Sequence, residues 1–178
     1  MIRSHFLIPL LILIRMLNVA YADSIDNTYR LGAGDKIEIS VYGEPDLSID
    51  ELNINTSGRF DYPYLGRLSA LNKTPEQLKN EISIGLKGDY LIAPKVRVSV
   101  TEFRSIYVNG EVKQPGAYEY QPGLTVDKAI ALAGGFTDRA ARNKIYVTKS
   151  GRADKANKYA LTQTILPGDI IVIEQSFF

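Results

Sequence analysis

The chain has 178 residues, of which 45% are apolar and 23% are charged, proportions typical of a folded globular protein rather than a disordered one. Its formal charge is +1, but the first 22 residues hold two arginines and no acid, so the remainder holds 19 basic against 20 acidic residues. A polybasic nucleic-acid-binding surface is therefore not expected. From Asp23 onward there is no Cys, His, Met or Trp, which excludes Ser-His-Asp triads, cysteine nucleophiles and thiolate or imidazole metal sites. We expect no metal site, and only carboxylate, lysine or tyrosine chemistry stays open to an enzyme.

The first 22 residues have the pattern of a secretory signal peptide. Arg3 gives a positive start, residues 6–14 are an uninterrupted apolar run, and Ala20-Tyr21-Ala22 offers small residues at both positions of a signal-peptidase site. Because a membrane-spanning helix needs about 20 apolar residues, we predict a cleaved signal peptide over residues 1–22. An uncleaved anchor and a buried helix are the alternatives. A lipoprotein is not expected, since lipidation of a bacterial signal needs a Cys at the cleavage point.

Period-two alternation of polar and apolar residues predicts several strands in the first half of the mature chain. The first covers residues 36–41 and follows a turn at Gly34 and Asp35. Further strands are expected over residues 52–55, 59–62 and 96–100.

One helix is predicted between these strands. Thr74 is a good N-cap, Pro75 suits the first helical position, and Gln77 completes a capping box. The buried face is expected to consist of residues spaced by four, Leu78, Ile82 and Leu86.

The second half repeats this mixture of strands and one helix. Strands are expected over residues 106–112, 117–120, 145–147 and 170–173. Thr125 is expected to cap a short helix that Gly134 and Gly135 end. Gly168 and Asp169, before the last strand, echo Gly34 and Asp35, but two shared turn residues do not establish a repeat.

We place a domain boundary near residue 104, between two small α+β modules with one helix each. Domains of about 75 residues bury only about 60% of their unfolded surface. These modules are therefore expected to be stabilised by contacts with each other or with neighbouring subunits.

The residues that could form a site are few. Gly32 and Gly34 lack the third glycine of a dinucleotide fingerprint and precede a strand rather than a helix, so no cofactor is implied. Five aspartates lie near turns or helix starts, and no glycosidase pair can be chosen among them. The segment from Tyr62 to Arg67 concentrates two tyrosines and a cation beside a turn. Its rings either pack half-buried or face a glycan, and the residues alone leave both alternatives open.

Three blocks of sequence together resemble the polysaccharide biosynthesis/export proteins of bacterial capsule and exopolysaccharide systems. Residues 29–48 are similar to the opening of that family, YRLGAGDKIEISVYGEPDLS. Residues 57–100, from SGRFDYPYLGRL to KVRVSV, are similar to its core. Residues 106–118, 125–140 and 166–173 look like one soluble-ligand-binding β-grasp domain.

The resemblance implies an α+β fold: a small strand-rich export domain with one helix over residues 23–104, then a β-grasp domain over residues 105–178. It implies a non-enzymatic component that forms a homo-oligomeric ring in the periplasm and passes polysaccharide toward the outer membrane. The implied partners are an inner-membrane polysaccharide co-polymerase and a separate outer-membrane β-barrel, the latter because only five residues follow the last predicted strand. The alternative is a monomeric periplasmic β-grasp module that binds a glycan or a small ligand.

In the family, the turn at Tyr62 to Arg67 is expected near the narrow, periplasm-facing end of the ring. We therefore expect Tyr62, Tyr64 and Arg67 to face the passing polysaccharide. A second set of residues is expected to shape turns rather than bind: Pro63, Gly66, Gly34, Asp35, Gly134 and Gly135.

Overall fold

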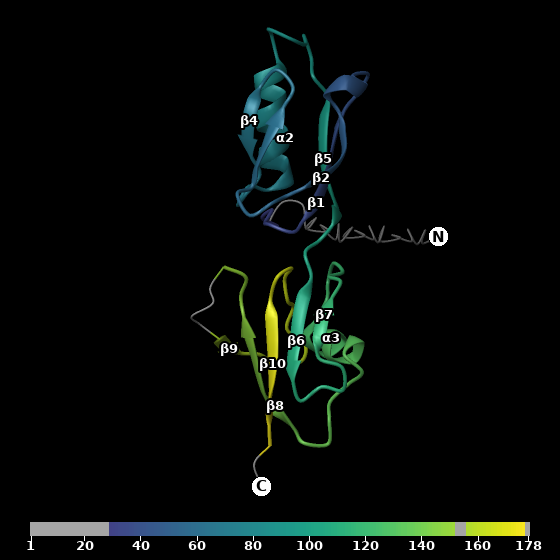
Figure 1. Ribbon diagram of the computed structural model, residues 1–178, viewed down its shortest axis with the longest axis vertical. Helices are drawn as coiled ribbons and strands as arrows, with labels where there is room; N and C mark the ends of the chain where they lie inside the picture. Colours follow the sequence, from purple (N-terminus) through teal and green to yellow (C-terminus); the bar gives the residue numbers. More distant parts are fainter. Residues whose placement is uncertain (1–28, 152–155, 177–178) are drawn as a thin grey trace, which may run out of the picture.

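The computed structural model describes residues 29–151 and 156–176, so the predicted signal peptide lies outside the described residues. Figure 1 shows two units placed end to end along the long axis, connected by one crossing of the chain at residues 103–105. We call the contact between the units around this crossing the seam. Within the described ranges, no helix is long and apolar enough to cross a membrane.

The first unit is a three-stranded antiparallel sheet with a helix and a separate hairpin. Its elements are β1 (Lys36–Val41), the 3-10 helix η1 (Pro45–Leu47), β2 (Ile49–Asn53), β3 (Arg59–Tyr62), β4 (Gly66–Ser69), α2 (Pro75–Leu86) and β5 (Val96–Glu102). The sheet order is β2-β1-β5, and β3 pairs with β4 alone. Ile37 and Ile39 of β1 are fully buried, as the alternation predicts, and belong to one core with the three predicted residues of α2, Leu78, Ile82 and Leu86.

The start of α2 forms as its sequence predicts. The side chain of Thr74 accepts from the backbone N–H of Gln77, and the side chain of Gln77 accepts from the backbone N–H of Thr74. This capping box satisfies two backbone donors that the first turn of a helix leaves free.

The second unit is a β-grasp fold. Its elements are β6 (Ile106–Gly110), β7 (Gly116–Tyr118), α3 (Val126–Leu132), β8 (Ala140–Thr148), β9 (Ala156–Lys158) and β10 (Ile170–Gln175). The sheet order is β7-β6-β10-β8-β9, in which the first and last strands pair in parallel at the centre. The helix α3 buries Val126, Ala129 and Ile130. The predicted α+β class, with a β-grasp domain second, is therefore confirmed.

Several element boundaries differ from the sequence prediction. The strand expected over 52–55 is β2, which begins earlier, at Ile49. The strand expected over 106–112 stops at Gly110, whose φ is +86° and whose missing Cβ would collide with the carbonyl oxygen of Ile173. Val112 therefore lies beyond the strand and instead forms an isolated bridge with Phe136. The short strands β4 and β9 were not predicted at all.

Candidate functional site at the seam

The expectation that Tyr62 faces a passing glycan is wrong for this structure. Tyr62 ends β3 opposite Gly66, its side chain is 2% exposed, and its hydroxyl donates to the backbone carbonyl of Leu47 at 2.6 Å. Burial raises the pKa of Tyr62 to about 12. Tyr62 is a core residue because its side chain, at the last position of β3, packs into the core of the first unit.

Tyr64 and Arg67 lie on the surface. Tyr64 has a φ of +63°, is 68% exposed, and stacks on Tyr90 with ring centroids 4.7 Å apart. Arg67 lies on β4, and its Nε is 3.6 Å from a carboxylate oxygen of Asp61, with both side chains exposed. Tyr64 at the tip of the β3–β4 hairpin thus forms an exposed aromatic pair with Tyr90, which lies between α2 and β5. A role for Tyr64 and Arg67 toward polysaccharide stays a prediction.

The residues expected to shape turns lie in turns or directly beside them. Gly34, Gly66, Gly134 and Gly135 have φ values of +95°, +68°, +78° and +85°, a region that side-chain-bearing residues rarely adopt. Pro63 begins the three-residue connection between β3 and β4, and its carbonyl accepts from the N–H of Leu65 at 2.8 Å.

Asp35 does more than shape its turn. The side chain is fully buried and accepts four hydrogen bonds, from the backbone N–H of Gly32, the hydroxyl of Tyr29, and both the backbone N–H and Nη1 of Arg104. Burial, and next the hydrogen bond to Asp35, raise the pKa of Tyr29 well above its ordinary value. Asp35 therefore anchors the chain crossing at Arg104 to the first unit.

Arg104 lies between the turn that precedes β1 and the turn that precedes β10. Its Nη1 is 2.9 Å from Asp35 and 2.7 Å from the hydroxyl of Tyr29. A Cβ on Gly32 would collide with the guanidinium, and a Cβ on Gly168 would lie 2.7 Å from its Nε. Glycine at both positions lets one arginine pack against both turns.

The turn at Asp169 in the second unit repeats the chemistry of the turn at Asp35. Asp169 is 1% exposed, its Oδ2 accepts from the N–H of Leu166, three residues earlier, and it pairs with Lys149 at 2.7 Å. Burial alone would lower the pKa of Lys149, but the hydrogen bonds and charges of Asp169 and Tyr159 more than offset this and raise it. Each unit therefore buries one aspartate beside the seam and pairs it with one cation.

Aromatic contacts also cross the seam. Phe103 lies edge-on to Tyr29, with centroids 5.0 Å apart, and to Tyr120 of the second unit, at 5.3 Å. Phe103 packs against both hydrophobic cores. The two units are thus joined by packing as well as by the polar contacts of Arg104.

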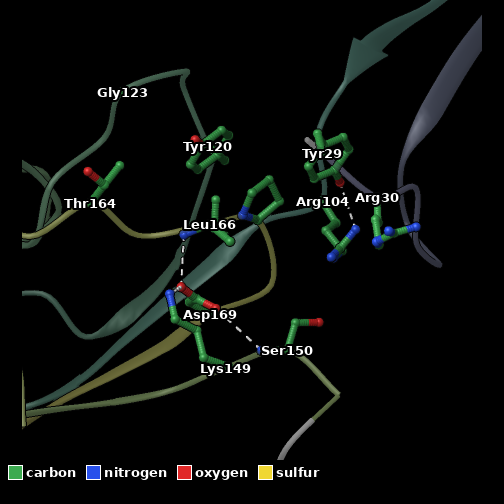
Figure 2. A pocket seen from close by; sticks show the side chains of 11 residues that line it. Tyr29, Arg30, Arg104, Tyr120, Gly123, Lys149, Ser150, Thr164, Leu166 and Asp169 are labelled. Carbon is green, nitrogen blue, oxygen red and sulfur yellow. Dashed lines mark hydrogen bonds and ion pairs between the residues drawn. The ribbon is translucent and has the colours of Figure 1, made fainter. Parts of the chain in front are cut away.

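These contacts surround a cavity of about 440 Å³, which we call the seam cavity. Figure 2 shows Tyr29, Arg30 and Arg104 on one side of it. From the second unit it is lined chiefly by Tyr120, Lys149, Leu166 and Asp169 (Figure 2). The cavity combines cations, tyrosines and apolar surface, the composition of a pocket that can hold a small ligand.

Sequence reasoning missed the seam cavity, because its walls come from residues near positions 30, 104, 120, 149 and 169. The shared Gly-Asp pairs before β1 and β10 were the available signal. Two buried aspartates in matching turns predict two cationic partners, and Arg104 and Lys149 are those partners.

Residues 23–101 match the family described as Polysaccharide biosynthesis/export protein, and residues 105–157 match the SLBB domain. The chain is 32% identical to "Exopolysaccharide production protein ExoF" of Rhizobium meliloti (strain 1021), an alignment that covers 70% of this chain and 33% of that protein. It is 29% identical to "EPS I polysaccharide export outer membrane protein EpsA" of Ralstonia nicotianae, covering 83% of this chain and 47% of that protein. The chain thus spans between a third and a half of these relatives' length. With an export module followed by an SLBB domain, it belongs to the polysaccharide biosynthesis/export family.

Proposed function

We propose that this protein is a non-enzymatic component of an exopolysaccharide export system. The observation that carries the proposal is the succession of an export module and an SLBB domain in one chain that resembles proteins named for exopolysaccharide production and export. A sequence without Cys or His after residue 22 supports a role in conduction rather than chemistry, because a polymer conduit needs repeated weak contacts and no transition-state machinery.

We further propose that the protein acts in the periplasm as a homo-oligomeric ring. The ring would receive polysaccharide from an inner-membrane co-polymerase and pass it to a separate outer-membrane β-barrel. The predicted signal peptide supports the location. The name of the Ralstonia relative, an outer membrane export protein, supports the association with outer-membrane machinery.

Exposed apolar side chains support self-association. At the end of the first unit away from the seam, Ile84 and Ile92 are 75% and 93% exposed, and Tyr42 is 81% exposed. Ile84 and Ile92 line one groove, and neighbouring apolar side chains this exposed are typical of surfaces that contact another subunit.

Two measurements test the proposal. Deletion of the gene should abolish surface polysaccharide and restoration of the gene should return it, whereas unchanged surface polysaccharide would refute the export role. Chemical cross-linking and analytical ultracentrifugation should give a ladder that stops at one closed size. A strict monomer at high concentration, with and without the periplasmic domain of the co-polymerase, would contradict the ring.

The seam cavity favours a second candidate, a monomeric periplasmic module that binds a glycan or small ligand. The same ultracentrifugation decides between the two, because a conduit has to close into a ring while a receptor does not.

A further inference from the structure

The seam cavity has an excess of positive charge. Arg30, Arg104 and Lys149 line it, and they face one lining carboxylate, Asp169, with Asp35 behind Arg104. Three cations therefore meet two carboxylates in a chain whose remaining charges nearly cancel. A cavity with this balance attracts an anion.

Hydrogen-bond donors in the cavity are left over after the protein's own contacts are made. Arg104 uses Nη1 for Tyr29 and Asp35, and its Nε and Nη2 make no hydrogen bond to any residue that the structure describes. Arg30 donates through Nη1 to the backbone carbonyl of Asn72 at 2.7 Å, and within the described ranges it has no carboxylate partner. Two planar guanidinium groups with free donors are suited to a carboxylate, which they bind through paired hydrogen bonds.

The remaining walls suit a sugar ring. Leu166 is 51% exposed, and with Pro167 it gives the cavity an apolar face. The hydroxyl-bearing residues Ser150 and Thr164 stand at exposed positions of the lining. A volume of about 440 Å³ is in the range of small-molecule sites. Apolar surface beside hydroxyls and cations is the combination that an acidic saccharide requires.

We propose that the seam cavity binds an acidic sugar, with the sugar carboxylate between Arg30 and Arg104 and the ring against Leu166 and Pro167. The proposal deepens the proposed function and rests on it for one point only, that the sugar belongs to the exported polymer. The cavity would then bind the charged sugar residues of the polysaccharide at the seam.

Calorimetric titration of the purified protein at low salt tests the chemistry. D-glucuronate should bind measurably while D-glucose does not, and added salt should weaken the binding because the cavity is open to solvent. A galacturonate hexamer should bind more tightly than monomeric D-galacturonate if the polymer is the ligand. Equal binding of glucose and glucuronate would overturn the charge argument. Equal affinity for monomer and hexamer would overturn the assignment to the polymer and leave a free acidic sugar.

One variant and one matched control locate the site. Arg30→Gln should weaken hexamer binding about tenfold, the loss expected for one charge-assisted hydrogen bond, and it should fold normally because Arg30 is exposed. Arg97→Gln removes an exposed arginine from β5 and should leave binding unchanged. The reverse result would move the site to β5 and overturn the proposal.

The outcomes also separate this inference from the export role. Loss of surface polysaccharide on gene deletion, with no binding of glucuronate or hexamer, would leave the export role standing and refute the seam cavity. Binding that Arg30→Gln weakens about tenfold, together with surface polysaccharide that does not depend on the gene, would refute the export role alone.

Discussion

Replacement of Asp35 by Asn should strongly destabilise the first unit and the seam. The carboxylate accepts from Gly32, Tyr29 and Arg104 with no exposure to solvent, and three of its four bonds go to Oδ2. An Asn side chain can turn its one oxygen toward these three donors, but its amide group then faces the backbone N–H of Arg104. At least one buried donor loses its acceptor, and the guanidinium of Arg104 loses its counter-charge.

The magnitude follows from these two losses. An unsatisfied buried donor costs about 1 to 3 kcal/mol, and removal of one partner from a buried ion pair costs about 3 to 5 kcal/mol. These terms overlap, and Arg104 keeps some contact with solvent, since its side chain is 19% exposed. We expect Asp35→Asn to lower the free energy of unfolding by about 3 kcal/mol.

Urea unfolding followed by circular dichroism measures this loss, and a double-mutant cycle assigns it to the pair. Arg104→Gln should cost a similar amount, and the double variant should cost less than the sum of the single variants by about 2 kcal/mol. Asp61→Asn is the control, because its pair with Arg67 is exposed and 3.6 Å long, and it should cost less than about 1 kcal/mol. Strictly additive losses, or an Asp35→Asn loss no larger than the control, would refute the anchoring role of Asp35.

Three further predictions concern stability. Gly110→Ala should lower the free energy of unfolding by about 3 kcal/mol, because a Cβ there meets the carbonyl oxygen of Ile173. Gly43 has a similar φ of +81° but open space around it, so Gly43→Ala should lower that free energy by only about 1 kcal/mol. Equal urea midpoints for the two variants would contradict this. Above about pH 10 the unfolded chain releases the proton of Tyr62 before the folded chain does, because burial raises the pKa of Tyr62 to about 12. The free energy of unfolding should therefore fall between about pH 10 and about 12, by up to about 1.4 kcal/mol per pH unit. In the same titration the free energy of unfolding of Tyr62→Phe should fall less steeply. Tyr62→Ala should cost about 3 kcal/mol or more, whereas Tyr64→Ala should cost less than about 1 kcal/mol and alter surface polysaccharide; a stable Tyr64→Ala with unchanged export would show that Tyr64 does not contact the polymer.

Local signals in the sequence predicted local structure. The capping box of Thr74 and Gln77 and the spacing of Leu78, Ile82 and Leu86 depend only on residues within one helix, and each formed as predicted. The strand β9 gave no such signal, because all three of its residues are exposed and it forms by pairing with β8.

The opposite positions of Tyr62 and Tyr64 depend on pairing that the sequence does not display. Both residues are tyrosines next to Pro63, so the local sequence does not distinguish them. Tyr62 is held inward by its pairing opposite Gly66, whereas Tyr64, at a φ of +63°, turns outward onto Tyr90. Sequence reasoning expected both tyrosines to face the polysaccharide, whereas the register of the hairpin buries Tyr62 and leaves Tyr64 exposed.

The proposed ring and the proposed seam site constrain each other. A ring would repeat the seam cavity once in each copy, so one polysaccharide chain would meet several identical sites, and their combined hold would far exceed that of one site. A conduit has to let its cargo leave, so each site has to bind only weakly. The buried aspartates at positions 35 and 169 neutralise Arg104 and Lys149, which leaves Arg30 as the cation without a carboxylate among the described residues. This arrangement supplies one unbalanced charge per copy, enough to favour an acidic sugar and too little to retain it.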